Sequence, residues 1–169
     1  LPYKEKSLTR KLIYQFKYKP YTKNLAKTLA SLIIEHLIIT QKNTDEIWNN
    51  AVLIPVPLFS KKLKERGYNQ SEELAKELSK ILRVPVFSDS LKKIKQTESQ
   101  IKLSKEEREK NLRGAFKVIA MSDIAILSGK KVFLVDDVYT TGSTMEECAR
   151  VLRNAGAKSV WGIAIAREE

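Results

Sequence analysis

The sequence predicts an α/β protein with a doubly wound, mostly parallel sheet. Short segments rich in β-branched residues alternate with segments of helical periodicity, which is the pattern of parallel strands joined by crossover helices. The clearest strand, residues 130–137, is followed after a short turn by the clearest helix, residues 143–156. The chain has 169 residues, 43% of them hydrophobic, which is enough for one compact core. We expect an N-terminal helical segment, 1–45, and an α/β core, 46–169, within one unit.

The N-terminal segment is expected to contain two helices. An apolar residue at every fourth position from Leu8 to Phe16 predicts a short amphipathic helix that ends near Pro20. A second helix should span residues 22–41. Residues 3–23 also mix lysines with aromatic rings, a composition that could stack single-stranded nucleic acid or form an amphipathic hood over an active site. We favour the hood.

The core elements are predicted from apolar patterning and turn residues. Residues 51–57 fit a buried strand closed by prolines, and residues 69–83 fit an amphipathic helix. The other expected elements are a strand at 84–87, a long charged loop with some helix near its end at 92–113, and strands at 114–119, 130–137 and 159–166. Ser143 with Glu146 predicts a capping box at the start of the helix that follows residue 142.

The composition narrows the classes of function. A single cysteine allows neither an intrachain disulfide nor a cysteine zinc site. No apolar run reaches the roughly 18 residues of a membrane span, and no secretory signal is visible, so we expect a cytoplasmic protein. A net charge of +11 favours anionic partners, which could be phosphorylated small molecules, nucleic acid or a membrane surface; a lysine-rich solubilising surface is the alternative.

Four residues of types that often carry chemistry are expected to pack in the core instead. His36 lies in an apolar helix, far in sequence from the acids discussed below. Cys148 lies on the apolar face of its predicted helix. Trp48 and Trp161 are most simply packing residues.

The stretch VFLVDDVYTTGST, residues 132–144, predicts an anion site. Ligands of parallel sheets bind beyond the carboxyl ends of strands, and a helix N-terminus offers free N–H groups and a positive dipole. Gly142 would let the backbone approach the ligand closely. We therefore expect the loop between strand and helix to hold a phosphate. The expected contacts are Val138, Thr140, Thr141, Gly142, Ser143 and Thr144.

Two adjacent acids beside a phosphate site indicate a ligand that carries other groups besides its phosphate. Asp136 and Asp137 would repel the phosphate unless they face another part of the same ligand. Carboxylates accept hydrogen bonds from hydroxyls and favour a nearby cation. Phosphoribosyl pyrophosphate (PRPP) has a 5-phosphate, a diol and a pyrophosphate that carries Mg²⁺, so the metal would lie near the acids without being bound directly. Since displacement at C1 develops positive charge, these acids are the expected catalytic residues.

Three other interpretations of this stretch are possible. A nucleotide hydrolase would need the G-x-x-x-x-G-K-[ST] phosphate loop, and a dinucleotide-binding domain would need G-x-G-x-x-G. Neither pattern occurs in the chain. A solvated acidic turn before a capped helix, with no ligand, stays open.

The stretch resembles the PRPP-binding signature of type I phosphoribosyltransferases. Blocks at residues 54–75, 97–100, 108–116 and 132–144 together resemble the competence protein F (ComF) family, and the resemblance runs from about residue 16 to 167. It implies the type I phosphoribosyltransferase fold, like the phosphoribosyltransferase half of glutamine-dependent amidophosphoribosyltransferases. Members of the family usually begin with a zinc-binding, cysteine-rich segment, and an arginine is usual where Lys93 stands. The sequence departs from the family at both points.

The resemblance also implies where pyrophosphate would bind. The turn from Pro57 to Lys62 would be its loop, and residues 92–113 would form a lid that excludes water from the reacting centre. The residues expected to contact pyrophosphate are Lys61, Lys62, Arg66, Lys93, Lys95, Thr97, Gln100, Arg108 and Asn111. The alternative is that these are ordinary surface groups. Asn69 could cap a helix or touch the ligand.

Two hypotheses for the function follow. The first is an enzyme, a Mg²⁺-dependent phosphoribosyltransferase that transfers phosphoribosyl from PRPP to an unknown acceptor and releases pyrophosphate. The second is an accessory protein of competence and DNA uptake that retains a non-catalytic PRPP site. Its partner would be single-stranded DNA or, as the resemblance implies, the helicase of that machinery.

Overall fold

A three-stranded parallel sheet forms the centre of the fold in the computed structural model. Its order is β1 (Ala51–Pro55), β4 (Lys131–Tyr139) and β5 (Ser159–Arg167), so β4 is the central strand. Within it, Ala51 pairs with Lys131, and Lys131 pairs with Ser159. The structure describes residues 8–18, 22–42, 44–97, 105–119 and 125–167, with the backbone alone at residues 105, 106, 108 and 109.

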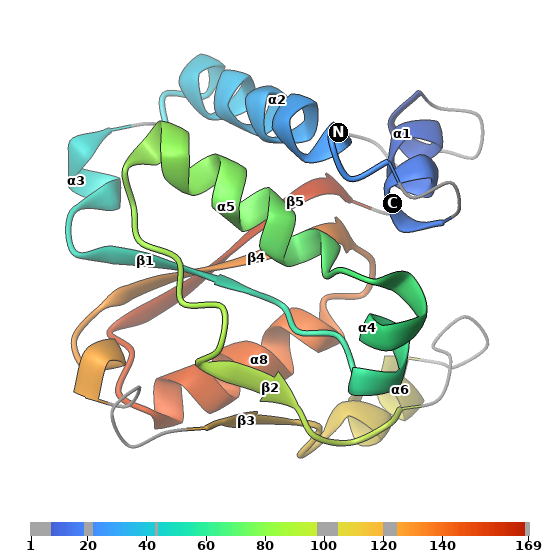
Figure 1. The fold of residues 1–169 in the computed structure, drawn as a ribbon. Helices are drawn as coiled ribbons and strands as arrows, with labels where there is room; N and C mark the ends of the chain where they lie inside the picture. Colours follow the sequence, from blue (N-terminus) through green and yellow to red (C-terminus); the bar gives the residue numbers. More distant parts are fainter. Residues whose placement is uncertain (1–7, 19–21, 43, 98–104, 120–124, 168–169) are drawn as a thin grey trace.

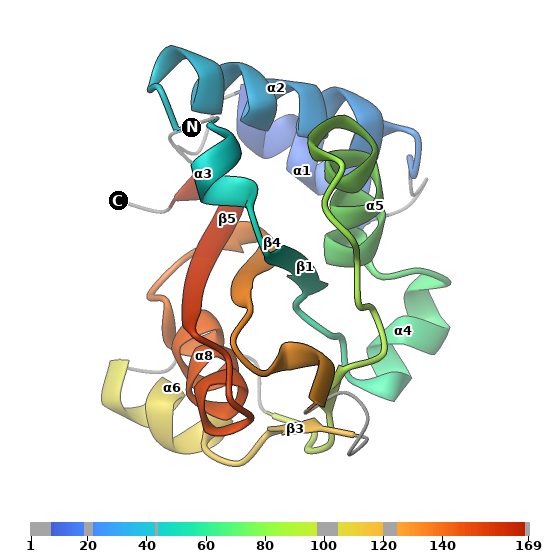
Figure 2. The same cartoon turned by 90° about the vertical axis from the view of Figure 1, so that its left-hand side faces the viewer.

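Helices cover both faces of this sheet, as Figures 1 and 2 show. Helices α2 (Leu25–Ile39) and α5 (Gln70–Leu82) lie over one face, and α8 (Ser143–Asn154) lies over the other. The predicted α/β class with a doubly wound, mostly parallel sheet is therefore confirmed.

The central strand separates two hydrophobic cores because successive side chains of a strand point to opposite faces. Phe133 and Val135 pack with α2 and α5, whereas Val132 and Leu134 pack with α8. All four side chains are buried. A strand buried on both faces reads as a continuous apolar run, which is why β4 was the clearest strand in the sequence.

The remaining elements surround this framework. They are α1 (Leu8–Lys17), α3 (Asp45–Trp48), α4 (Ser60–Arg66), α6 (Lys105–Leu112) and a two-stranded antiparallel ribbon of β2 (Leu91–Lys93) with β3 (Phe116–Val118). Helices α1 and α4 lie at the end of the sheet toward which β1 runs (Figure 1). Among the described residues, no helix is both long enough and apolar enough to cross a membrane.

Several element predictions were wrong in detail. Residues 84–87 make only an isolated bridge, between Leu53 and Val86, instead of a strand. The strand expected at 114–119 is shorter and pairs with β2, which overlaps the start of the segment predicted as a loop. Such three-residue strands carry too few side chains for a period-2 pattern to reveal them.

The predictions for packing residues are half correct. Cys148 is fully buried, and the Trp48 ring lies 4.6 Å from that of Phe133, as expected for core residues. His36 is exposed on α2, and Trp161 is 61% exposed on β5, so both were wrongly placed in the core. Trp161 lies on β5, an edge strand of the sheet. Within the described part of the chain, β5 has a neighbouring strand on one side only.

Candidate active site

The two adjacent acids lie near the carboxyl end of the central strand. Asp136 pairs in register with Ala164 of β5, and Asp137 is buried, with 6% of its surface exposed. Because neighbouring residues of a strand face opposite sides, the two carboxylates meet different surroundings.

The Asp136 carboxylate is half-buried and receives two hydrogen bonds. Ser71 Oγ donates to its Oδ1 at 3.0 Å, and the backbone N–H of Asp137 donates to the same oxygen at 2.8 Å. Burial, followed by the negative charge of Asp137, raises the pKa of Asp136 from 3.8 to about 7. The Lys17 charge and the two hydrogen bonds oppose that rise. A carboxyl group with this pKa can gain or lose a proton near neutral pH, as a general base must.

The Asp137 carboxylate forms an ion pair with a residue from the N-terminal helix. Lys17 Nζ lies 2.9 Å from Asp137 Oδ1, and the two side chains are 23% and 8% exposed. The final turn of α1 therefore reaches Asp137. A hood over an active site stays a prediction.

The turn after β4 is shorter than predicted. Strand β4 continues to Tyr139, so Val138 belongs to the strand and packs against the hydrophobic core instead of opening the phosphate loop. The loop itself is residues 140–142, and α8 begins at Ser143. The predicted capping box of Ser143 with Glu146 was wrong: Gly142 is the N-cap, and no side chain caps the helix. Ser143 Oγ lies 3.0 Å from Thr141 Oγ1.

Gly142 has a backbone conformation that favours glycine. Its φ of +84° lies in the left-handed region, where a side chain is strained. A Cβ at this position would also lie 2.6 Å from Cζ of Tyr139. The Tyr139 ring lies 5.4 Å from the guanidinium of Arg167, which holds it beside the loop. The loop, the N-cap and the first N–H groups of a twelve-residue helix thus lie a few residues after the acids.

Part of the predicted pyrophosphate side is assembled. Lys93 Nζ donates to Thr97 Oγ1 at 2.7 Å and lies 5.5 Å from the Phe116 ring centre. Burial, followed by the positive charge of Lys62, lowers the pKa of Lys93, whereas the negative charge of Asp136 acts in the opposite direction. Residues from α4, β2 and β4 are therefore close enough to share one electrostatic field.

The other predicted contacts are less well placed or lie outside the described residues. Lys61 is exposed in the first turn of α4, which is a helix where a turn was expected. The Arg66 guanidinium lies 5.9 Å from the Tyr18 ring, toward α1. Lys95 is exposed. Arg108 and Asn111 belong to α6, and only the backbone of Arg108 is described; Gln100 lies outside the described residues.

Residues at the start of α5 hold the side chain that contacts Asp136. Asn69 caps this helix by accepting from the Ser71 N–H at 3.2 Å, and its side-chain amide donates to the Val56 carbonyl at 3.1 Å. The capping interpretation of Asn69 is therefore confirmed. This cap ties the segment after β1 to the turn that carries Ser71, and so positions the hydroxyl that reaches Asp136.

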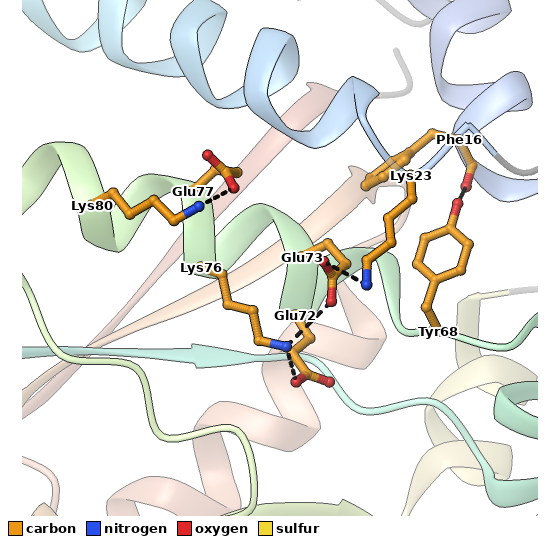
Figure 3. Close-up of polar contacts among 8 residues, drawn as sticks. All are labelled: Phe16, Lys23, Tyr68, Glu72, Glu73, Lys76, Glu77 and Lys80. Carbon is orange, nitrogen blue, oxygen red and sulfur yellow. Dashed lines mark hydrogen bonds and ion pairs between the residues drawn. The ribbon is translucent and has the colours of Figure 1, made fainter.

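The same region connects α5 to the N-terminal helices, as Figure 3 shows. The Tyr68 hydroxyl donates to the carbonyl of Phe16, and Lys23 forms an ion pair with Glu73 at 3.2 Å. Glu72, Glu77, Lys76 and Lys80 make further pairs along the exposed face of α5.

Sequence reasoning missed three residues that touch the acids or their cover: Lys17, Tyr68 and Ser71. Tyr68 and Ser71 lie close in sequence to the predicted cap Asn69, within the block at residues 54–75. No local pattern distinguishes Lys17 from the other lysines near the N-terminus, because its partner lies far along the chain.

The acids do not belong to a preformed metal cluster. Within the described part of the chain, no group of three or more His, Cys, Asp or Glu side chains could hold a metal ion. Two carboxylates, one of them paired with an ammonium, suit a divalent cation that arrives with an anionic ligand better than a resident ion.

A separate groove lies away from the acids. It has a volume of about 770 Å³ and is bounded by α2, α3 and β5, with Phe133, Trp48 and Trp161 among its lining residues. None of the predicted site residues lines it.

Fold and site together define a class of protein. A family model described as the phosphoribosyl transferase domain matches residues 68–167, which is more than half of the chain. The chain belongs to this family. The match includes Ser71, both aspartates and the loop before α8.

Individual relatives confirm the resemblance to the competence protein F family. Competence protein F of Haemophilus influenzae is 36% identical over 156 residues, covering 90% of this chain and 66% of that protein. DNA utilization protein YhgH of Salmonella typhi is 31% identical over 149 residues, covering 88% of this chain and 63% of that protein. The chain thus spans slightly less than two thirds of the length of these curated relatives.

Solved structures confirm the type of fold. Glutamine PRPP amidotransferase from B. subtilis, complexed with ADP and GMP, matches 90% of this chain and 30% of its own with a TM-score of 0.54 and 17% identity. A structure described as the allosteric regulatory enzyme of purine biosynthesis matches the same shares with a TM-score of 0.53 and 18% identity. At these identities the likeness concerns the fold alone.

Proposed function

We propose that the protein binds PRPP with Mg²⁺ and transfers the phosphoribosyl group to an acceptor, with release of pyrophosphate. One observation carries the proposal: a buried and a half-buried carboxylate lie near the carboxyl end of the central strand, a few residues before a glycine turn at a helix N-terminus. The 5-phosphate would bind the N–H groups and hydroxyls of residues 140–144, and Asp136 and Asp137 would face the ribose hydroxyls. The pyrophosphate would lie toward Lys62 and Lys93.

This arrangement suits substitution at C1 of the ribose. The acceptor forms a bond to C1 as the bond from C1 to the pyrophosphate oxygen breaks, and pyrophosphate leaves with the electron pair. Mg²⁺ would arrive on the pyrophosphate, where it neutralises the leaving group. The carboxylates would stabilise the positive charge that develops on the sugar. With a pKa of about 7, Asp136 is suited to receive the proton that the acceptor loses.

Calorimetric titration with PRPP·Mg²⁺ tests the proposal. We expect saturable binding by the unmodified chain and its loss in the double variant Asp136→Asn/Asp137→Asn. The variant Asp45→Asn/Glu46→Gln is the matched control, because it also neutralises two adjacent acids, which are exposed on α3. Equal binding by both variants would contradict the assignment of the site. Release of pyrophosphate, followed with ammonia, purine bases and pyrimidine bases offered in turn, then tests for transfer.

A second function is favoured by a different observation. The exposed rings of Tyr14, on α1, and Tyr18, directly after it, lie 4.7 Å apart, and the Arg66 guanidinium lies over Tyr18. Aromatic rings beside a cation can stack the bases of single-stranded nucleic acid. Together with the +11 charge and the competence and DNA utilization names of the relatives, this supports an accessory role in DNA uptake, with single-stranded DNA or a helicase as partner. A cytoplasmic location stays a prediction.

Binding of a single-stranded oligonucleotide across salt concentrations tests this second function. We expect an affinity that falls steeply with salt, because lysines would replace counterions on the phosphates. Tyr14→Ala/Tyr18→Ala should weaken binding at every salt concentration without changing the slope. Absence of binding at low salt would overturn the accessory role, and PRPP binding in the same preparation would leave the first function standing.

A further inference from the structure

The ion pair between Lys17 and Asp137 uses the group that the proposed function needs for its ligand. Lys17 Nζ lies 2.9 Å from Oδ1 of Asp137, and both side chains are largely enclosed. An ammonium at this distance donates a charge-assisted hydrogen bond to that oxygen. A ribose hydroxyl, or a cation carried by the pyrophosphate, would have to approach the same carboxylate.

Helix α1 presents Lys17 from a fixed position. Ile13 and Phe16, which belong to α1, are fully buried, and the Tyr68 hydroxyl donates to the Phe16 carbonyl. The Phe16 and Tyr68 rings also lie 5.9 Å apart. The preceding residue of the chain is therefore anchored to the core, which aims the Lys17 side chain at the end of β4.

We propose that Lys17 is a built-in competitor for Asp137, so that a sugar phosphate with its cation must displace the ammonium before it can engage this acid. The inference rests on the proposed function and adds the means by which the chain regulates that site. Because coupling between two binding events is reciprocal, a ligand that takes Asp137 must also weaken the hold on the last turn of α1.

A direct role of Lys17 in ligand binding predicts the opposite result. If Lys17 contacted the phosphates of bound PRPP, its removal would delete a positive charge from the site and lower the affinity. If Lys17 competes with the ligand, its removal leaves Asp137 available and raises the affinity. The direction of one measured change therefore separates the two roles.

The test is a calorimetric titration of PRPP·Mg²⁺ into the full chain carrying Lys17→Met. We expect binding tighter than in the unmodified chain by about 5- to 20-fold, in the usual range for coupling between sites. The matched control is Lys11→Met, which removes the same charge from an exposed position of the same helix and should leave the affinity unchanged. Unchanged or weaker binding by Lys17→Met overturns the inference while the proposed function stands.

A second readout uses the unmodified chain and does not depend on how the variant folds. Amide hydrogen exchange of residues 13–17 is compared with and without saturating PRPP·Mg²⁺. Competition predicts faster exchange in this turn when the ligand is bound, and slower exchange overturns the inference. If neither the unmodified chain nor Lys17→Met binds PRPP, the proposed function fails, and the inference fails with it.

Discussion

The ring of Tyr139 occupies the space in which residue 142 would carry a side chain. A Cβ on Gly142 would lie 2.6 Å from Cζ of Tyr139, and the backbone there has φ +84°. Contact and conformation thus both select glycine at the N-cap of α8.

Gly142→Ala is therefore expected to lower the free energy of unfolding by about 1–3 kcal/mol, the cost of a strained backbone position. It should also weaken PRPP binding, because either the Tyr139 ring or the turn must shift. Urea denaturation and calorimetry measure the two effects. Gly129→Ala is the control for backbone strain alone, since Gly129 has φ +72° and nothing lies within 4 Å of its Cβ position. Equal losses in both variants would show that the Tyr139 contact is unimportant.

The stability of the ligand-free protein should fall as pH rises from about 4 to about 7. The folded protein keeps the Asp136 proton up to a pKa of about 7, whereas the unfolded chain loses it near 3.8. The folded state therefore binds more protons across this window, and each step upward in pH favours unfolding until about pH 7. Asp137, Lys17 and Ser71 are the neighbours that set this pKa.

Urea denaturation of the unmodified chain and of Asp136→Asn between pH 4 and pH 8 measures this dependence. The variant should lack the part of the pH dependence that belongs to Asp136. Parallel curves for the two proteins would mean that Asp136 is ionised in the folded state throughout.

Lys93→Met should weaken binding of inorganic pyrophosphate more than binding of ribose 5-phosphate. Lys93 lies near Lys62, Thr97 and Asp136, where the pyrophosphate of the proposed ligand would bind. The loss of one charge-assisted contact predicts about 10-fold weaker pyrophosphate binding. Lys92→Met, an exposed neighbour on the same strand, should change neither affinity. Equal losses for both ligands would place Lys93 outside the pyrophosphate side.

Asn69→Ala should lower the free energy of unfolding by about 1–3 kcal/mol. It removes the cap of α5 and leaves the buried carbonyl of Val56 without the amide that donates to it. Asn154→Ala, which truncates an exposed asparagine in α8, should stay within about 0.5 kcal/mol of the unmodified protein. A loss in Asn69→Ala no larger than in this control would show that the cap is dispensable.

The fold was predictable where residues near in sequence decide the structure. The sequence predicted the buried strand β4, the amphipathic helix α5 and the Asn69 cap. It also predicted a role for Gly142 in the turn. The ribbon of β2 and β3 was not predicted, because each strand has three residues and their pairing depends on segments far apart in the chain.

The site was predictable only in part for the same physical reason. The acids and the turn after them are contiguous, so their chemistry can be read from one stretch. Their neighbours Lys17 and Ser71 reach them from other elements, and the Ser71 contact spans 65 positions. The prediction that Val138 lies in the phosphate loop was wrong because pairing with Ala166 of β5 extends the strand beyond the aspartates.

The position of β4 between β1 and β5 affects the order in which the candidate site forms during folding. Only one helix separates β4 from β5 in the chain. A much longer stretch separates β1 from β4, and it must form a closed loop before Ala51 can pair with Lys131. Closing that long loop costs more entropy, so β4, α8 and β5 should assemble early and β1 should dock late. Ser71 follows β1 and can reach Asp136 only after that event. A refolding chain would therefore recover most of its secondary structure before it could recognise any ligand.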